Sequence, residues 1–186
     1  VTYERVRALI GKGGDKLLPE LTGVDPEGEE GQRLQEARAA LFKRRYLPAL
    51  RPLPGARALV QHLHDQGLRL AVASSAQAEE LQTLLQVAGV EELLTRVASS
   101  SDAEHSKPDP DIIHAALAQL RLPAAAVVMI GDTPYDIIAA QRAGVAIIAL
   151  RCGGRWSDDD LRGADALYDS PADLLRQVDA SPLRRA

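Results

Sequence analysis

The chain of 186 residues is short of several features, and each shortage excludes a class of protein. Its single cysteine, Cys152, cannot form an internal disulfide, which is typical of a reducing compartment. No apolar run approaches the ~18 residues of a membrane-spanning helix. Lys and Arg number 22 against 26 Asp and Glu, so the basic excess of nucleic-acid-binding proteins is missing. We expect neither a membrane nor a nucleic-acid partner and, without a signal-peptide pattern, a cytoplasmic location.

What the sequence does contain is typical of a globular protein with two parts. Hydrophobic residues make up 46% and charged residues 26%, which allows a sizeable core. Residues 1–50 predict three helices, at 3–10, 16–21 and 27–47, and no strand. Three prolines and Gly55 interrupt residues 47–55, which we interpret as a linker. We therefore expect a small helical unit at 1–50 and a second unit at 51–186.

The second unit alternates short apolar runs with amphipathic segments. Strands are predicted at residues 70–73, 96–98, 127–130 and 145–150. Helices are predicted between them, at residues 56–66, 78–87, 109–120 and 135–143. Near-continuous apolar strands are typical of burial on both faces. The pattern therefore predicts a doubly wound α/β fold with a parallel sheet between helices.

Polar residues follow these strands where an open parallel sheet places its ligands. Asp132 and Asp136 lie four residues apart, after strand 127–130 and on the first turn of the next helix. Both carboxylates can point to one place, and such hard oxygen ligands favour Mg²⁺ over Zn²⁺. In the alternative interpretation Asp132 caps the helix and Asp136 is solvated.

Two further residues fit an anion site. Lys107 precedes a helix whose start is fixed by prolines, where free amides favour an anion, or else it is an exposed loop lysine. Ser74 ends strand 70–73 and can bind phosphate oxygens, or it can serve as a helix N-cap.

Taken in order, Ser74, Lys107-Pro108 and Gly131-Asp132-xxx-Asp136 resemble three motifs of the haloacid dehalogenase superfamily of phosphotransferases. Residues 52–55, with the sequence Pro-Leu-Pro-Gly, resemble the linker that follows a helical cap in the branch of phosphoglycolate phosphatases and β-phosphoglucomutases. The resemblance extends along the chain. It implies a cap at 1–50 and a Rossmann-like core of this superfamily at 51–186.

The resemblance also implies a function, a Mg²⁺-dependent phosphatase of a small phosphorylated metabolite, and roles for five residues. Ser74 and the amide of Ser75 would hold phosphate oxygens, and Lys107 would neutralise the charge of nucleophile and phosphate. Asp132 would ligate Mg²⁺, and Asp136 would bind or orient water on the metal. The expected mechanism passes through an aspartyl-phosphate.

The cap would choose the substrate. Its glycine-rich turn at residues 11–16 carries Lys12 and Lys16, which could meet an anionic group of the substrate. Alternatively, Gly11 ends one helix and Asp15 caps the next.

One motif of the superfamily is missing. Asp-x-Asp-Gly-Thr, which ends the first core strand and supplies the nucleophile, has no counterpart in these 186 residues. We therefore expect that the chain is truncated at its N-terminus, that the first core strand is absent between the strands ending at Ala73 and Ile130, and that residues 1–186 alone are inactive.

Three alternative functions remain open. A β-phosphoglucomutase-like isomerase usually carries Glu-Asp where this chain has Gly131-Asp132. A 2-haloacid dehalogenase generally needs no Mg²⁺ and lacks the paired aspartates. A non-catalytic binding module would apply if the gene also lacks the nucleophile. Monomer and homodimer are equally compatible with the sequence.

Overall fold

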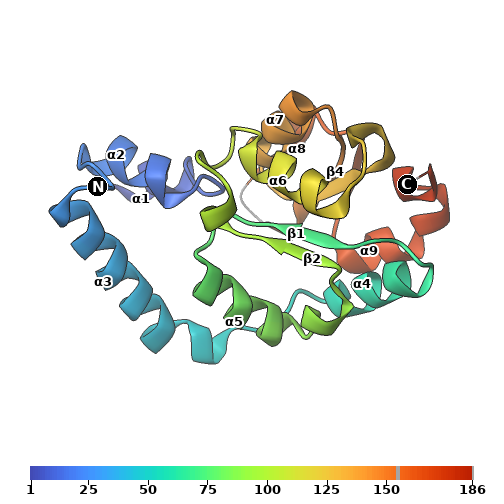
Figure 1. Ribbon diagram of the computed structural model, residues 1–186, viewed down its shortest axis with the longest axis horizontal. Helices are drawn as coiled ribbons and strands as arrows, with labels where there is room; N and C mark the ends of the chain where they lie inside the picture. The colour runs from blue at the N-terminus through green and yellow to red at the C-terminus, as the bar shows by residue number, and fades with distance from the viewer. Residues whose placement is uncertain (154–155, 186) are drawn as a thin grey trace.

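The computed structural model describes residues 1–153 and 156–185. Three N-terminal helices lie at one end of the molecule (blue in Figure 1), and we refer to residues 1–50 as the cap. They are α1 (Tyr3–Arg7), α2 (Gly14–Thr22) and α3 (Glu29–Arg45). A short 3₁₀ turn at Leu47–Ala49 and the proline-rich residues that follow connect α3 to the core. Within the described ranges, no helix is both long and apolar enough to cross a bilayer.

The core alternates strands and helices, as predicted. The strands are β1 (Ala71–Ala73), β2 (Arg96–Ala98), β3 (Val128–Gly131), β4 (Ala146–Leu150) and β5 (Ala166–Tyr168). The helices are α4 (Ala56–Asp65), α5 (Ala78–Ala88), α6 (Asp111–Leu120), α7 (Pro134–Ala143), α8 (Asp158–Leu161) and α9 (Pro171–Arg176). The predicted α/β fold with parallel strands is confirmed, whereas β5, α8 and α9 were not predicted.

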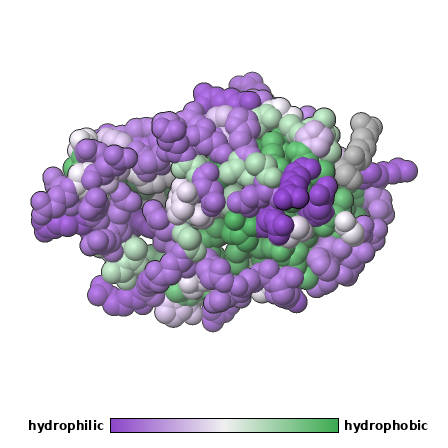
Figure 2. All heavy atoms as spheres, viewed as in Figure 1, coloured by the Kyte–Doolittle hydropathy of each residue, from purple (hydrophilic) through white to green (hydrophobic). Residues whose placement is uncertain are grey.

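All the strand pairs are parallel, but they form two sheets. β1 pairs with β2, with Ala71 opposite Arg96, and β4 lies between β3 and β5. No ladder joins β1 to β3 in the described part of the chain. Between these two strands lies a cavity of about 480 Å³, lined by both strands and by apolar side chains of α4 and α6. Figure 2 shows apolar residues gathered over the core, whereas the cap is mostly hydrophilic.

The core is densest around β4. Ile147 and Ile148 point to opposite sides of this strand, and each is at most 1% exposed. One belongs to a cluster with Ile112 of α6, the other to a cluster with Leu174 of α9. Full burial of such a side chain contributes roughly 1.5–3 kcal/mol. Because β3 pairs with β4, the buried side chains of β4 fix the position of β3 and of the polar segment that follows β3.

Candidate active site

The segment after β3 fixes one of its two aspartates tightly. Thr133 is the N-cap of α7, and its hydroxyl accepts a hydrogen bond from the amide of Asp136 at 3.1 Å. The Asp136 carboxylate accepts from the amide of Asp132 at 3.2 Å and from the amide and hydroxyl of Thr133 at 3.0 and 2.8 Å. Asp136 is only 4% exposed. The alternative in which Asp132 caps the helix and Asp136 is solvated is therefore wrong.

Lys107 completes the coordination of Asp136. Its ammonium donates to the free oxygen of the carboxylate at 2.7 Å, and the two side chains are 14% and 5% exposed. The alternative of an exposed loop lysine is thus wrong. Because both oxygens of Asp136 are engaged, this geometry favours a positioning role over direct metal ligation. The metal contact predicted for Asp136 stays a prediction.

Asp132 is in the opposite situation. Its carboxylate is partly buried and makes no hydrogen bond or ion pair with any other residue that the structure describes; only the backbone of Asp132 itself offers it a hydrogen bond. Burial, and then the negative charge of Asp136, raise the pKa of Asp132, although Lys107 acts in the opposite direction. A desolvated carboxylate without a partner is costly, and a cation would relieve that cost.

The donor set around Asp132 fits Mg²⁺. This ion is usually held by one or two carboxylates, with water and substrate phosphate in its other positions. Among the described residues, no group of three His, Cys, Asp or Glu side chains is arranged to hold a metal. Asp132 would therefore be one ligand of several, and the others would have to come from water, from phosphate or from another segment; its metal contact stays a prediction.

Ser74 follows β1 without capping a helix. Gln77 is the N-cap of α5, so the alternative of a helix cap at Ser74 is wrong. Its hydroxyl instead accepts a hydrogen bond from the amide of Ala76 at 3.2 Å, which closes a short turn. This turn places Ser74 at the carboxyl end of β1, where the sequence predicted it.

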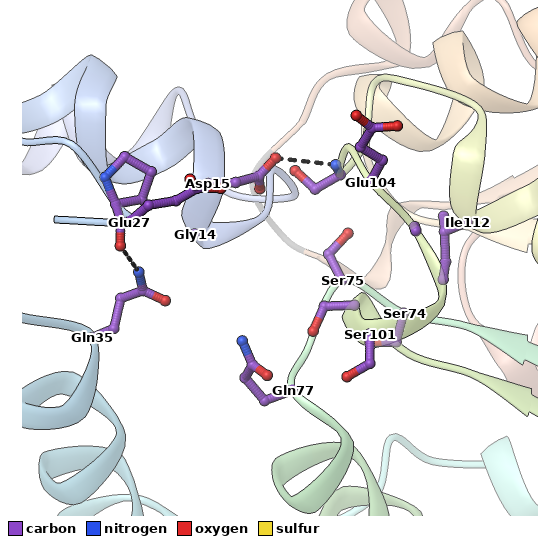
Figure 3. A pocket seen from close by; sticks show the side chains of 14 residues that line it. Gly14, Asp15, Glu27, Gln35, Ser74, Ser75, Gln77, Ser101, Glu104 and Ile112 are labelled. Carbon is purple, nitrogen blue, oxygen red and sulfur yellow. Dashed lines mark hydrogen bonds between the residues drawn. The ribbon is translucent and has the colours of Figure 1, made fainter. Parts of the chain in front are cut away.

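A cavity of about 310 Å³ connects this turn to the cap. Ser74 and Ser75 line it (Figure 3). Ser106, the residue before Lys107, lines it as well. The structure thus brings Lys107, Asp132 and Asp136 together and places the serines beside the same loop. Phosphate binding by Ser74 and Ser75 stays a prediction.

The two cap lysines are engaged elsewhere. Lys12 forms an ion pair with Glu20 and lies 5.1 Å from the centre of the Tyr135 ring. Lys16 forms an ion pair with Asp109 in the loop before α6. Neither lysine lines the cavity. The geometry therefore favours a structural role for both, and the predicted contact with substrate stays a prediction.

The glycine-rich turn of the cap docks onto the core. The amide of Gly13 donates to the hydroxyl of Ser106 at 3.1 Å, and the Ser106 amide donates to the Asp15 carboxylate at 3.1 Å. A Cβ atom on Gly11 would lie 2.8 Å from the Thr133 side chain. Since Ala8 ends α1 and Gly13 caps α2, the alternative of caps at Gly11 and Asp15 is wrong.

Comparison with known proteins identifies the family. The family profile described as "Haloacid dehalogenase-like hydrolase" matches residues 1–150, most of the chain. The chain belongs to this family of hydrolases. The phosphoglycolate phosphatase of Photobacterium profundum is 31% identical to this hydrolase over 187 residues, which cover 96% of the chain and 81% of the relative.

Two solved structures resemble the hydrolase closely. A hydrolase from Pseudomonas syringae superposes with a TM-score of 0.88 at 27% identity, over 97% of this chain and 83% of that one. CbbY from Rhodobacter sphaeroides, solved in complex with xylulose-(1,5)bisphosphate, has a TM-score of 0.78 at 26% identity. The match covers 93% of this chain and 80% of the CbbY chain. Both solved structures therefore share the fold of this hydrolase from the cap through most of the core.

Replacing Gly11 by alanine is expected to loosen the cap. The new methyl group would collide with Thr133, and φ at Gly11 is +113°, a conformation that L-residues rarely adopt. Gly23 is the matched control, because its φ is +75° but nothing lies within 4 Å of its Cβ position. We expect Gly11→Ala to increase the radius of gyration in small-angle scattering while Gly23→Ala leaves it unchanged. Equal radii in the two variants would contradict docking through this turn.

Two residues that support the site escaped the sequence interpretation. Thr133 holds Asp136, and the spacing Thr-x-x-Asp that signals a capping box was readable in the sequence. Tyr135 donates its hydroxyl to the carbonyl of Ala8 and thereby ties α7 to the cap. No local pattern marks this second contact, because its partners are 127 residues apart.

Proposed function

We propose that this hydrolase is a Mg²⁺-dependent phosphatase of small phosphorylated metabolites. The observation that carries the proposal is the partly buried Asp132, which has no side-chain partner among the described residues and lies beside the ion pair of Lys107 and Asp136. This arrangement offers one carboxylate to a cation and one ammonium to an anion at the same end of the core. Metal and ammonium charge are needed where negative charge accumulates in phosphoryl transfer.

The proposed reaction has two displacement steps. A carboxylate from a segment outside residues 1–186 attacks phosphorus, and the bond from phosphorus to the ester oxygen breaks. The released alkoxide takes a proton from an acid of that same segment. Water then attacks the aspartyl-phosphate at phosphorus and gives a proton back to the conjugate base of that acid, while the bond from phosphorus to the carboxylate oxygen breaks; inorganic phosphate is released and both groups are restored. Lys107 and the Ser75 amide stabilise charge on the phosphoryl oxygens, while Asp136 keeps Lys107 in place. Mg²⁺, when bound at Asp132, supplies positive charge to the phosphoryl group.

The metal requirement is the direct test. The gene's full product should hydrolyse p-nitrophenyl phosphate and release inorganic phosphate in the presence of Mg²⁺. We expect EDTA to lower the rate at least 100-fold and excess Mg²⁺ to restore it. Unchanged activity in EDTA would remove the metal from the mechanism, and conversion of a sugar phosphate into an isomer without phosphate release would favour the mutase alternative.

A further inference from the structure

The cavity between cap and core is placed to receive the part of a substrate that leaves with the ester oxygen. Its floor is made by Ser74 and Ser75 after β1, beside the proposed phosphate position, and its opposite wall comes from the start of α2 and the segment before α3 (Figure 3). Its volume of about 310 Å³ lies at the small end of the ~300–1,000 Å³ typical of small-molecule sites. A single compact metabolite would fill it.

The charge of the lining is one-sided. Asp15 and Glu27 of the cap and Glu104 of the core are carboxylates, and none of the described residues that line the cavity is Lys, Arg or His. The cap lysines that could offset this charge are paired with Glu20 and Asp109. All three carboxylates are solvent-exposed, so a substrate with a second anionic group beyond its phosphate would meet their summed repulsion, which salt weakens.

The neutral polar lining is suited to hydroxyl groups. Gln77 reaches into the cavity from the start of α5, and Gln35 faces it from α3 (Figure 3). The Gln35 amide donates to the Pro26 carbonyl at 3.0 Å, which leaves its own carbonyl oxygen free to accept. The hydroxyls of Ser75 and Ser100 are buried and have no hydrogen-bond partner among the described residues. Unpaired buried polar groups are costly, and a ligand hydroxyl would satisfy them.

We infer that the cavity binds an uncharged, hydroxyl-rich leaving group, so that sugar or polyol phosphates are preferred over substrates with a second anion such as 2-phosphoglycolate. This inference rests on the proposed function and assigns its substrate class. The lining carboxylates act as hydrogen-bond acceptors for the hydroxyls and also exclude the carboxylate of the competing substrate. Specificity comes from both effects.

The test compares kcat/KM of the gene's full product for glucose 6-phosphate, ribose 5-phosphate, glycerol 3-phosphate and 2-phosphoglycolate. At least one of the first three is expected to exceed 2-phosphoglycolate by at least 10-fold. The double variant Glu27→Gln, Glu104→Gln should lower this ratio about 10-fold, chiefly by improving turnover of 2-phosphoglycolate. Glu36→Gln, on an exposed position of α3 outside the cavity, is the matched control and should leave the ratio unchanged.

A second variant tests the hydroxyl contacts. Gln77→Ala should lower kcat/KM for the preferred sugar or polyol phosphate at least 5-fold more than it lowers kcat/KM for p-nitrophenyl phosphate, whose leaving group offers no sugar hydroxyls to Gln77. Preference for 2-phosphoglycolate, or an unchanged ratio in the double variant, would overturn the inference while leaving the phosphatase intact. If no ester is hydrolysed, the proposed function fails, and calorimetric titration with the same four compounds still decides which class binds.

Discussion

Asp132→Asn is expected to lower the kcat of the full-length phosphatase at least 100-fold and, unusually for a site mutation, to stabilise the fold. The loss of activity follows because the neutral amide no longer holds Mg²⁺, and loss of one electrostatic group typically costs about 10²- to 10³-fold. The gain in stability follows because burial, and then the negative charge of Asp136, disfavour the ionised carboxylate and raise the pKa of Asp132. Activity assays and urea unfolding without Mg²⁺ measure the two effects.

The stability difference between wild type and Asp132→Asn is expected to depend on pH. Because the folded-state pKa of Asp132 lies above its ordinary value of 3.8, the folded protein binds the proton more tightly than the unfolded chain does. Stability is therefore lost as pH rises from about that value through the folded-state pKa. The advantage of Asp132→Asn should vanish below the ordinary pKa and be complete at neutral pH. A variant less stable than wild type at pH 7, or equally active, would contradict this account of Asp132.

Asp136→Asn is the matched comparison, and its effect on stability should be opposite. Its carboxylate accepts four hydrogen bonds, one of them from Lys107. Breaking a buried ion pair by removing one partner costs about 3–5 kcal/mol, because the other charge stays buried. Urea unfolding should thus separate two aspartates that lie four residues apart. Similar stability changes in both variants would show that their environments do not differ as described.

The parts of this site that the sequence could predict are those whose contacting residues lie close together along the chain. The strand ends that carry Ser74 and Asp132 were predictable, because apolar runs and the polar residues after them are local patterns. The capping box of Thr133 and Asp136 was also local, although it was not read. The docking of Ser106 on Asp15 spans 91 residues, and no period or turn signal reports such a contact. The same limit explains why the ion pair of Lys16 with Asp109, 93 residues away, could not be anticipated.

In the fold, too, some elements could be predicted from local sequence patterns and others could not. Helices α4 and α7 were predicted within one residue of both ends, because a glycine, Gly67 or Gly144, marks where each of them stops. The strand Ala166–Tyr168 has only three residues, and its place beside β4 comes from pairing rather than from its own pattern. Tertiary pairing thus determines the shortest elements, and sequence periodicity determines the longer ones.

An apolar strand between β1 and β3 is expected to stabilise the core strongly. Each of these strands has one described partner, and the cavity of about 480 Å³ between them is lined mostly by apolar side chains. A parallel strand there would satisfy backbone groups on both edges, and leaving such groups buried and unpaired costs roughly 1 to 3 kcal/mol each. Against a domain stability of about 5–15 kcal/mol, we expect a gain of more than ~3 kcal/mol.

The measurement compares residues 1–186 with a version that also carries the segment expected before Val1. Urea unfolding gives the stability difference, and hydrogen exchange should show new protection of backbone amides in Ala71–Ala73 and Val128–Gly131. A matched version with proline at the centre of the added strand should lose most of the gain, because proline cannot donate to the ladder. Equal protection in all three versions would show that β1 and β3 need no strand between them. The carboxylate at the end of that strand would then have no route to Asp132, and the proposed phosphatase would lose its nucleophile.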